Sequence, residues 1–135
     1  MASTHGKRSR DKGKCGEREL VNWLKAYGIE ASRGFQARGG SAEEPDIVHN
    51  IPGLHIECKR NEQMTPHGGL LRKAMDQAKA DAGELIPCVF WRVSRQPWMV
   101  SWEIFGELLV TTRADAWMEK NGYLRTDATE SEPDE

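Results

Sequence analysis

The stretch PDIVHNIPGLHIECK, residues 45–59, decides the fold of this chain. It contains two apolar runs, residues 46–49 and 54–59, that have the length and composition of short strands. Residues 50–53, Asn-Ile-Pro-Gly, separate the two runs and predict a turn. The stretch therefore predicts two neighbouring strands joined by a tight connection.

Side chains in a strand alternate between the two faces of its sheet. Glu57 and Lys59 therefore project on one face, whereas Ile56 and Cys58 point to the other face, toward the core. If the first strand pairs antiparallel with the second, Asp46 lies beside Glu57. The sequence then predicts two carboxylates and an ammonium group within a few ångströms, on different strands.

Two carboxylates and an ammonium group close together are typical of a site for a divalent cation. Mg²⁺ prefers oxygen ligands, which Asp46, Glu57 and the backbone carbonyl of Cys58 can supply. Such an ion neutralises charge that develops on a scissile phosphate, and Lys59 would orient the attacking water. A Glu-x-Lys pair alone is also common on solvated strand faces, so this interpretation needs support from elsewhere in the chain.

The segment that precedes these strands predicts a helix that brings in a third carboxylate. Glu17 lies three residues before the first member of an apolar face with helical spacing: Leu20, Val21, Leu24 and Tyr27. Gly28 is placed to end this helix. Because Glu17 shares the buried face, it needs a partner, and a metal ion would supply one.

The remaining pattern predicts a mixed α/β fold in one domain. Apolar runs and turn residues indicate a short strand at 29–33, a helix at 70–82, strands at 87–93 and 98–102, and a short helix at 103–109. A helix, three strands, a helix and two strands favour an α/β architecture with a mixed central sheet flanked by helices.

Charge divides the chain into three parts. Residues 1–14 carry five bases and one acid and predict a flexible basic arm, which either holds DNA phosphates or is merely solvated. Residues 15–112 form the expected domain. Residues 113–135 are weakly patterned and end in an acidic tail, so we expect little structure there. Without that tail the chain is mildly basic, which permits nucleic-acid binding.

Cysteine and histidine spacing argues against a zinc site. Cys15, Cys58 and Cys88 are widely separated and form no C-x-x-C pair, which fits a protein of the reducing cytoplasm with buried thiols. The N-terminus has no apolar run typical of a secretory signal. The histidines at 49, 55 and 67 lack ligand spacing, and we expect none of them to bind metal. The tryptophans at 91, 98 and 102 are expected in the core or a dimer interface.

The segment Lys12–Val21, KGKCGERELV, resembles the opening of the archaeal-type Holliday junction resolvases of the PD-(D/E)XK superfamily. The similarity continues through Arg33, the Gly40-Ser41 loop, Asp46 and the run Ile56-Glu57-Cys58-Lys59, and covers about residues 12–93. Phage-encoded resolvase-like nucleases share this layout. The loop between Arg33 and Asp46 is longer here than in the archaeal pattern.

The resemblance implies a restriction-endonuclease-like fold, a homodimer, cleavage of branched DNA, and dependence on Mg²⁺, for which Mn²⁺ can substitute. It implies a catalytic set of Glu17, Asp46, Glu57 and Lys59, with metal ligands Glu17, Asp46 and Glu57. Residues expected to contact DNA are Arg18, Arg33 and Ser41 by this match, with Arg38 and Arg60 added from their positions. Gln77, on the helix after the Glu-x-Lys strand, is a second-tier candidate, since some relatives of the wider superfamily carry a helical glutamine there.

Three functions remain open from the sequence. The first is a junction-resolving endonuclease of the cytoplasm, encoded by a cell or by a phage. The second is a restriction-like or repair nuclease that cuts duplex, nicked or flap DNA. The third is a DNA-binding module without catalysis, against which the presence of all four motif side chains argues. A single domain of this size favours recognition of DNA shape over base sequence.

Overall fold

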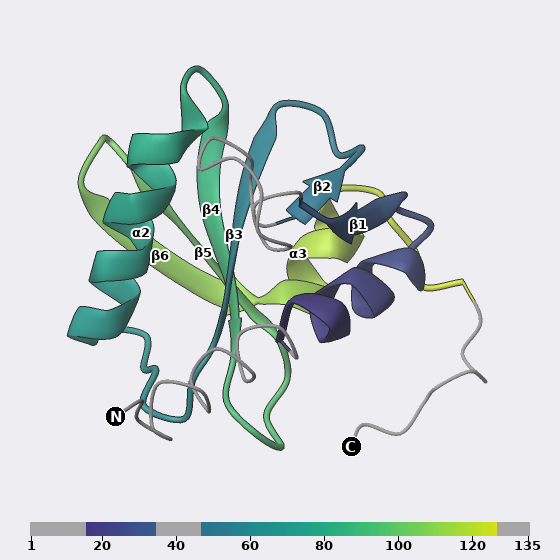
Figure 1. The fold of residues 1–135 in the computed structure, drawn as a ribbon, viewed down its shortest axis with the longest axis horizontal. Helices are drawn as coiled ribbons and strands as arrows, with labels where there is room; N and C mark the ends of the chain where they lie inside the picture. The colour runs from purple at the N-terminus through teal and green to yellow at the C-terminus, as the bar shows by residue number, and fades with distance from the viewer. Residues whose placement is uncertain (1–15, 35–46, 127–135) are drawn as a thin grey trace, which may run out of the picture.

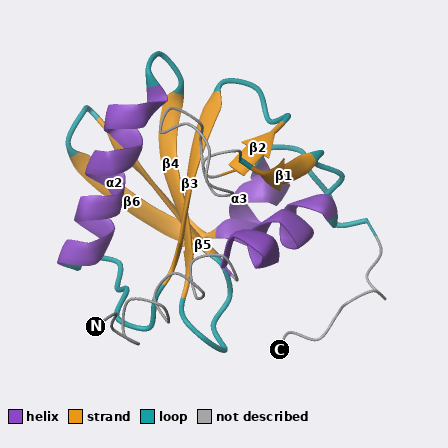
Figure 2. Ribbon diagram, viewed as in Figure 1, coloured by secondary structure: helices purple, strands orange, loops and turns teal. Residues whose placement is uncertain are grey.

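The computed structural model describes residues 16–34 and 47–126. Its first element is a helix over residues 16–25. The elements that follow (Figure 1, Figure 2) are β1 Ala31–Arg33, β2 Ile47–His49, β3 Leu54–Arg60, α2 Gly69–Ala82, β4 Ile86–Arg92, β5 Met99–Ile104, β6 Leu108–Arg113 and α3 Ala114–Lys120. None of the helices in these two ranges is long and apolar enough to cross a membrane.

The predicted mixed sheet is confirmed. The described strands form a four-stranded sheet in the order β3-β4-β5-β6, in which β3 and β4 run parallel and the other pairs antiparallel. Helix α2 is the crossover between the parallel strands β3 and β4. β1 and β2 form a separate antiparallel pair.

The predicted pairing of strand 46–49 with strand 54–59 is wrong. β2 pairs with β1, and the side chain of Asn50 supports this pair by accepting a hydrogen bond from the backbone N–H of Glu30 at 3.0 Å. β3 pairs with β4 instead, because its residues 55–58 are buried in an unbroken run, as in strands covered on both faces. The turn at 51–53 therefore connects β2, in the two-stranded sheet, to β3, in the four-stranded sheet.

Alternate residues of the four-stranded sheet pack against different helices. Ile56, Cys58 and Phe90 pack with the helix 16–25 and with α3, in a cluster that includes Leu20, Leu24 and Met118. Val89 and Trp91 pack with α2 through Leu71, Met75 and Ala78. Figure 1 shows α2 on one side of the sheet and the other two helices on its opposite side. The sheet is therefore the middle layer of three.

The helix 16–25 follows its apolar pattern. Leu20 and Leu24 are fully buried, and the helix ends in a turn that closes at Gly28, which has a φ of 79°. A residue with a side chain is strained at such a positive φ, so glycine is suited to this position. The predicted end of the helix is confirmed.

Two predictions for the C-terminal third are wrong. Residues 103–109 form the end of β5, a hairpin turn and the start of β6, because Phe105 and Gly106 adopt positive φ values of 56° and 78°, which match the twist of a hairpin. Residues 114–120, expected to be weakly structured, form α3. Ala114 and Met118 lie one helical turn apart and are fully buried, and this contact stabilises the helix.

An acidic side chain that is 7% exposed pairs with two bases of α2 and so links this helix to the sheet. Glu103 of β5 accepts from Arg72 at 2.5 Å and pairs with Lys79 at 2.9 Å, both on α2. The hydrogen bond from Arg72, aided by Lys79 and opposed by burial, lowers the pKa of Glu103 below its ordinary 4.5. The pairing therefore stabilises the fold above that pH and is lost as the pH falls below it.

We expect Glu103→Gln to lower the free energy of unfolding by about 1–3 kcal/mol at pH 7, since Arg72 and Lys79 lose a charged acceptor. The difference from wild type should shrink as the pH is lowered through 4.5 toward 3. Urea unfolding at several pH values measures both effects. Glu107→Gln, an exposed acid of the adjacent turn, is the control. Equal stability of Glu103→Gln and wild type at pH 7 would contradict the role given to this contact.

Candidate active site

β3 presents three ionisable side chains on the face that α2 covers. His55, Glu57 and Lys59 alternate along the strand, and Glu57 and Lys59 stand in register with Val89 and Trp91 of the α2-facing cluster. Lys59 Nζ lies 3.9 Å from Glu57 Oε2, and His55 Nε2 lies 3.8 Å from Glu57 Oε1. The Glu57 carboxylate therefore has a cationic group on one oxygen and an imidazole on the other.

Burial differs sharply among these three groups. The side chains of His55 and Glu57 are 5% and 7% exposed, whereas that of Lys59 is 44% exposed. Lys59 can thus meet a solvent-borne ligand while Glu57 stays in a low-dielectric environment. A carboxylate so deeply buried needs a compensating charge, and Lys59 at 3.9 Å supplies only a loose one.

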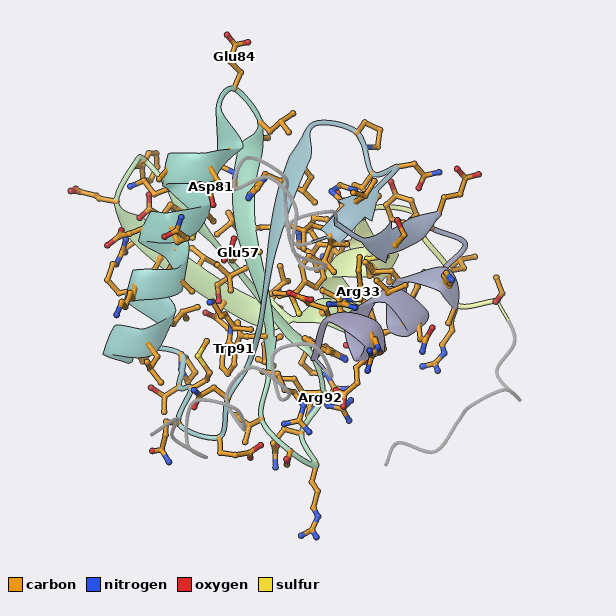
Figure 3. The ribbon with its side chains drawn as sticks, viewed as in Figure 1. Arg33, Glu57, Asp81, Glu84, Trp91 and Arg92 are labelled. Atoms are coloured by element: carbon orange, nitrogen blue, oxygen red, sulfur yellow. The ribbon has the colours of Figure 1, made fainter. Side chains whose placement is uncertain are left out.

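Helix α2 adds a second carboxylate. One ligand atom each from His55, Glu57 and Asp81 lie within 4.8 Å of one another, a grouping that could hold a metal ion. Gln77, one helical turn before Asp81, donates a hydrogen bond from Nε2 to Asp81 Oδ2 at 3.0 Å. Figure 3 shows Asp81 on α2 and Glu57 on the side of β3 that this helix covers. Gln77, the second-tier candidate, thus contacts this group through Asp81.

One ring nitrogen of the buried His55 imidazole, Nε2, has no hydrogen-bond partner among the described residues. The other buried side-chain nitrogen and oxygen atoms of residues 16–34 and 47–126 do have such a partner. Burying such an atom without a partner is costly. An unpartnered nitrogen beside a buried carboxylate fits a divalent cation, whose bonds would satisfy both groups.

Glu17 lies in a different environment. Its Oε1 accepts a hydrogen bond from Arg33 Nε at 3.1 Å, and both side chains are mostly buried. Among the described residues, Glu17 is not a member of the group around Glu57. Figure 3 shows Arg33, the last residue of β1, next to the helix 16–25, whereas Glu57 lies toward α2. The structure thus joins two of the predicted site residues, Glu17 and Arg33, to each other.

Arg60 forms ion pairs with two glutamates. Its guanidinium pairs with Glu19 at 3.1 Å and with Glu62 at 2.7 Å, and Arg92 approaches the same Glu19 oxygen at 3.6 Å. Hydrogen bonds from the hydroxyl and backbone N–H of Ser94, helped by Arg60, lower the pKa of Glu62 to about 2. Arg60 therefore joins the helix 16–25 to the end of β3.

The surroundings of His49 in β2 favour its neutral form. Burial lowers its pKa, and its Nδ1 accepts a hydrogen bond from the backbone N–H of Ile51 at 3.0 Å. This contact shapes the connection between β2 and β3. Trp91 and Trp98 are each 3% exposed and belong to the core, as expected, and Trp91 Nε1 donates to Ser101 Oγ at 2.9 Å.

The other predicted site residues have separate outcomes. Arg18 is exposed on the helix 16–25. Asp46, Arg38 and Ser41 lie outside the described residues. Cys58 and Cys88 are buried, as expected.

Two residues of the group around Glu57 were not expected from the sequence. His55 was expected to bind no metal, yet its position two residues before Glu57 places it on the same strand face. That spacing was a usable signal. Asp81 gave none, because its approach to β3 depends on how α2 packs on the sheet.

Comparisons with known proteins give one family. The sequence model described as archaeal Holliday junction resolvase (Hjc) matches residues 8–115. Among solved structures, the chain is similar to the 1.6 Å resolution structure of Archaeoglobus fulgidus Hjc, a Holliday junction resolvase from an archaeal hyperthermophile. The two are 19% identical, the similarity covers 72% of this chain and 83% of that one, and the TM-score is 0.45. A comparison with curated protein sequences gave no match.

Proposed function

The chain belongs to the archaeal Holliday junction resolvase family, and on this premise we propose that it is a metal-dependent endonuclease that cuts four-way DNA junctions. The observation that carries the proposal is the buried Glu57 carboxylate with Lys59 at 3.9 Å on the same strand face. The family match supplies the class of reaction, and this geometry supplies the groups that the reaction needs.

The proposed metal site is built on Glu57. His55 and Asp81 stand close enough to share a cation with it. Two ligand atoms about 2.1 Å from one octahedral ion are about 3 Å apart when adjacent and about 4.2 Å apart when opposite. The 3.8 Å between His55 Nε2 and Glu57 Oε1 lies between these two values, so both atoms can bind one ion once the side chains shift by a few tenths of an ångström. We expect Mg²⁺ as the usual ion, with Mn²⁺ able to replace it.

Asp46 and Glu17 remain proposed members of the catalytic set. Ile47, which follows Asp46 in the sequence, pairs with Arg33, and Arg33 holds Glu17. This connectivity supports assigning Asp46 and Glu17 to one region of the site. We propose that Arg33 fixes the Glu17 carboxylate before DNA binds.

In the proposed reaction the divalent ion, Lys59 and Glu57 have different roles. A divalent ion at this site would act as a Lewis acid that neutralises charge on the scissile phosphate. Lys59, which is half exposed, would donate hydrogen bonds to the attacking water and to the phosphate oxygens as their charge grows. Glu57 holds the Lys59 ammonium near the phosphate position. Arg18, Arg38, Ser41 and Arg60 are proposed contacts to the DNA backbone, with Arg60 already anchored by two acids.

We propose a homodimer as the active form, because two phosphodiester bonds must be cut on opposite strands of a junction. The described residues form one domain with no separate recognition module. Recognition would therefore depend on the shape of the DNA more than on its base sequence.

A substrate panel tests the proposed specificity. With Mg²⁺ present, we expect a four-way junction to be cut at least about tenfold faster than linear duplex, nicked, flap and single-stranded DNA of the same sequence. A tenfold difference in rate corresponds to about 1.4 kcal/mol of transition-state stabilisation. Product mapping on denaturing gels measures the rates. Preference for flap or nicked DNA would replace the proposal with a repair nuclease. Tight binding of junctions without cleavage in Mg²⁺ or Mn²⁺ would replace it with a non-catalytic DNA-binding module.

A further inference from the structure

We infer that His55 is a nitrogen ligand of the metal that Glu57 binds, with Asp81 as the second carboxylate, and that the site therefore binds a first-row transition ion more tightly than Mg²⁺. This inference rests on the proposed metal-dependent function. It goes beyond that function by assigning two ligands, one on β3 and one on α2. The expected nuclease motif contains neither residue.

The first observation is the imidazole nitrogen itself. His55 is 5% exposed, and its Nε2 has no hydrogen-bond partner among the described residues. The atom faces Glu57 Oε1 at 3.8 Å. That separation is too long for a hydrogen bond, and it is within a few tenths of an ångström of the spacing of two ligands on opposite sides of one ion.

The second observation is the position of Asp81. A carboxylate oxygen of Asp81 completes a triangle with His55 and Glu57 in which all separations are within 4.8 Å. Gln77 fixes the other side of this carboxylate through a 3.0 Å hydrogen bond. A ligand held by a neighbouring side chain is a common feature of metal sites. Asp81 is exposed near the end of α2, so it supplies the solvent-facing ligand of the site.

The choice of ion follows from the donor atoms. Mg²⁺ takes oxygen ligands almost exclusively. Imidazole nitrogen favours first-row transition ions, whose affinities also rise from Mn²⁺ to Cu²⁺. A site with one nitrogen and two carboxylates should therefore bind Mn²⁺ more tightly than Mg²⁺, although Mg²⁺ at high concentration can still occupy it.

Pulsed EPR of Mn²⁺ added to the protein tests the assignment directly. Bound Mn²⁺ should show a strong ¹⁴N coupling in wild type, which becomes a ¹⁵N coupling when histidine is ¹⁵N-labelled. His55→Gln should lose the coupling and weaken Mn²⁺ binding at least about tenfold, the smallest loss usual for residues that support a metal. Mg²⁺ affinity, measured by competition with Mn²⁺, should fall much less.

Matched variants assign the signal to single residues. His67→Gln, exposed and away from the group, should keep the coupling. Asp81→Asn should weaken Mn²⁺ binding, whereas Asp76→Asn, an exposed acid of the same helix that pairs with Arg72, should not. If His55→Gln does not fold, a variant with His5→Gln, His49→Asn and His67→Gln leaves His55 as the single histidine and should retain the coupling.

Two results would overturn the inference. One is Mn²⁺ bound to wild type without nitrogen coupling, and the other is a coupling that persists unchanged in His55→Gln. If junction cleavage proceeds in either case, the proposed function stands and only the ligand assignment fails. If the coupling follows His55 but no junction is cut with any divalent ion, the proposed function fails and the metal site remains.

Discussion

Replacing Lys59 with alanine is expected to slow junction cleavage by about 10²–10³-fold, the usual cost of removing one donor that stabilises charge in a transition state. Lys59 is 44% exposed, so its removal should leave the fold intact. It lies 3.9 Å from Glu57, and in the proposed active site its ammonium would contact the scissile phosphate beside the metal. Single-turnover cleavage of a labelled junction with saturating Mg²⁺ measures the effect.

Binding and cleavage should separate in this variant. Junction affinity of Lys59→Ala, measured by fluorescence anisotropy at fixed salt, should stay within a few fold of wild type, since one phosphate contact among many is lost. Asp46→Asn should behave in the same way. Lys25→Ala, an exposed lysine at the end of the helix on the opposite side of the sheet, is the matched control and should cut normally. Wild-type cleavage by Lys59→Ala would remove Lys59 from the active site.

The second large effect concerns the core. Phe90→Ala is expected to lower the free energy of unfolding by about 3–5 kcal/mol, as large-to-small changes of buried aromatic residues do. Phe90 is fully buried between two tryptophans, with ring centroids 6.4 Å from Trp23 and 6.0 Å from Trp117. It therefore joins the sheet to the helix 16–25 and to α3, and its loss should loosen both helices.

Phe105→Ala is the matched control for this prediction. Phe105 is 91% exposed in the turn between β5 and β6, and its replacement should change stability by less than about 0.5 kcal/mol. Denaturant unfolding followed by tryptophan fluorescence measures both variants. Similar stabilities for Phe90→Ala and Phe105→Ala would contradict the role of Phe90 in packing the sheet against the helix 16–25 and α3.

The sequence predicted the parts of the fold that depend on local periodicity. α2 and the strands β3 and β4 appear close to their expected bounds, because each carries a continuous apolar face. The alternation along β3 correctly placed Glu57 and Lys59 on one face and Ile56 and Cys58 on the other. These predictions depend on how apolar residues are spaced along the chain, about every 3.6 residues in a helix and every 2 in a strand. That spacing can be read from a single sequence.

Pairing between strands could not be predicted in the same way. The alternation in β2 shows that it is a strand but does not show that its partner is β1. The hairpin between β5 and β6 was missed because Phe105 adopts a positive φ, which is unusual for a residue with a side chain. α3 was missed because its buried face consists of few residues over seven positions.

The candidate site was predicted in part for related reasons. Glu57 and Lys59 meet because neighbours on one strand face are fixed by the sequence. His55 could have been added by the same rule, whereas Asp81 approaches them through packing of α2 on β3. The participation of Glu17 and Asp46 at the same ion stays a prediction.

The most direct test of the central claim is cleavage of a synthetic four-way junction by the purified wild-type protein, with Mg²⁺ and with a chelator in its place. We expect symmetric incisions on opposite strands with Mg²⁺, and none with the chelator until Mg²⁺ or Mn²⁺ is restored. Absence of incision under both ions, with the junction bound, would contradict a metal-dependent nuclease centred on Glu57 and Lys59.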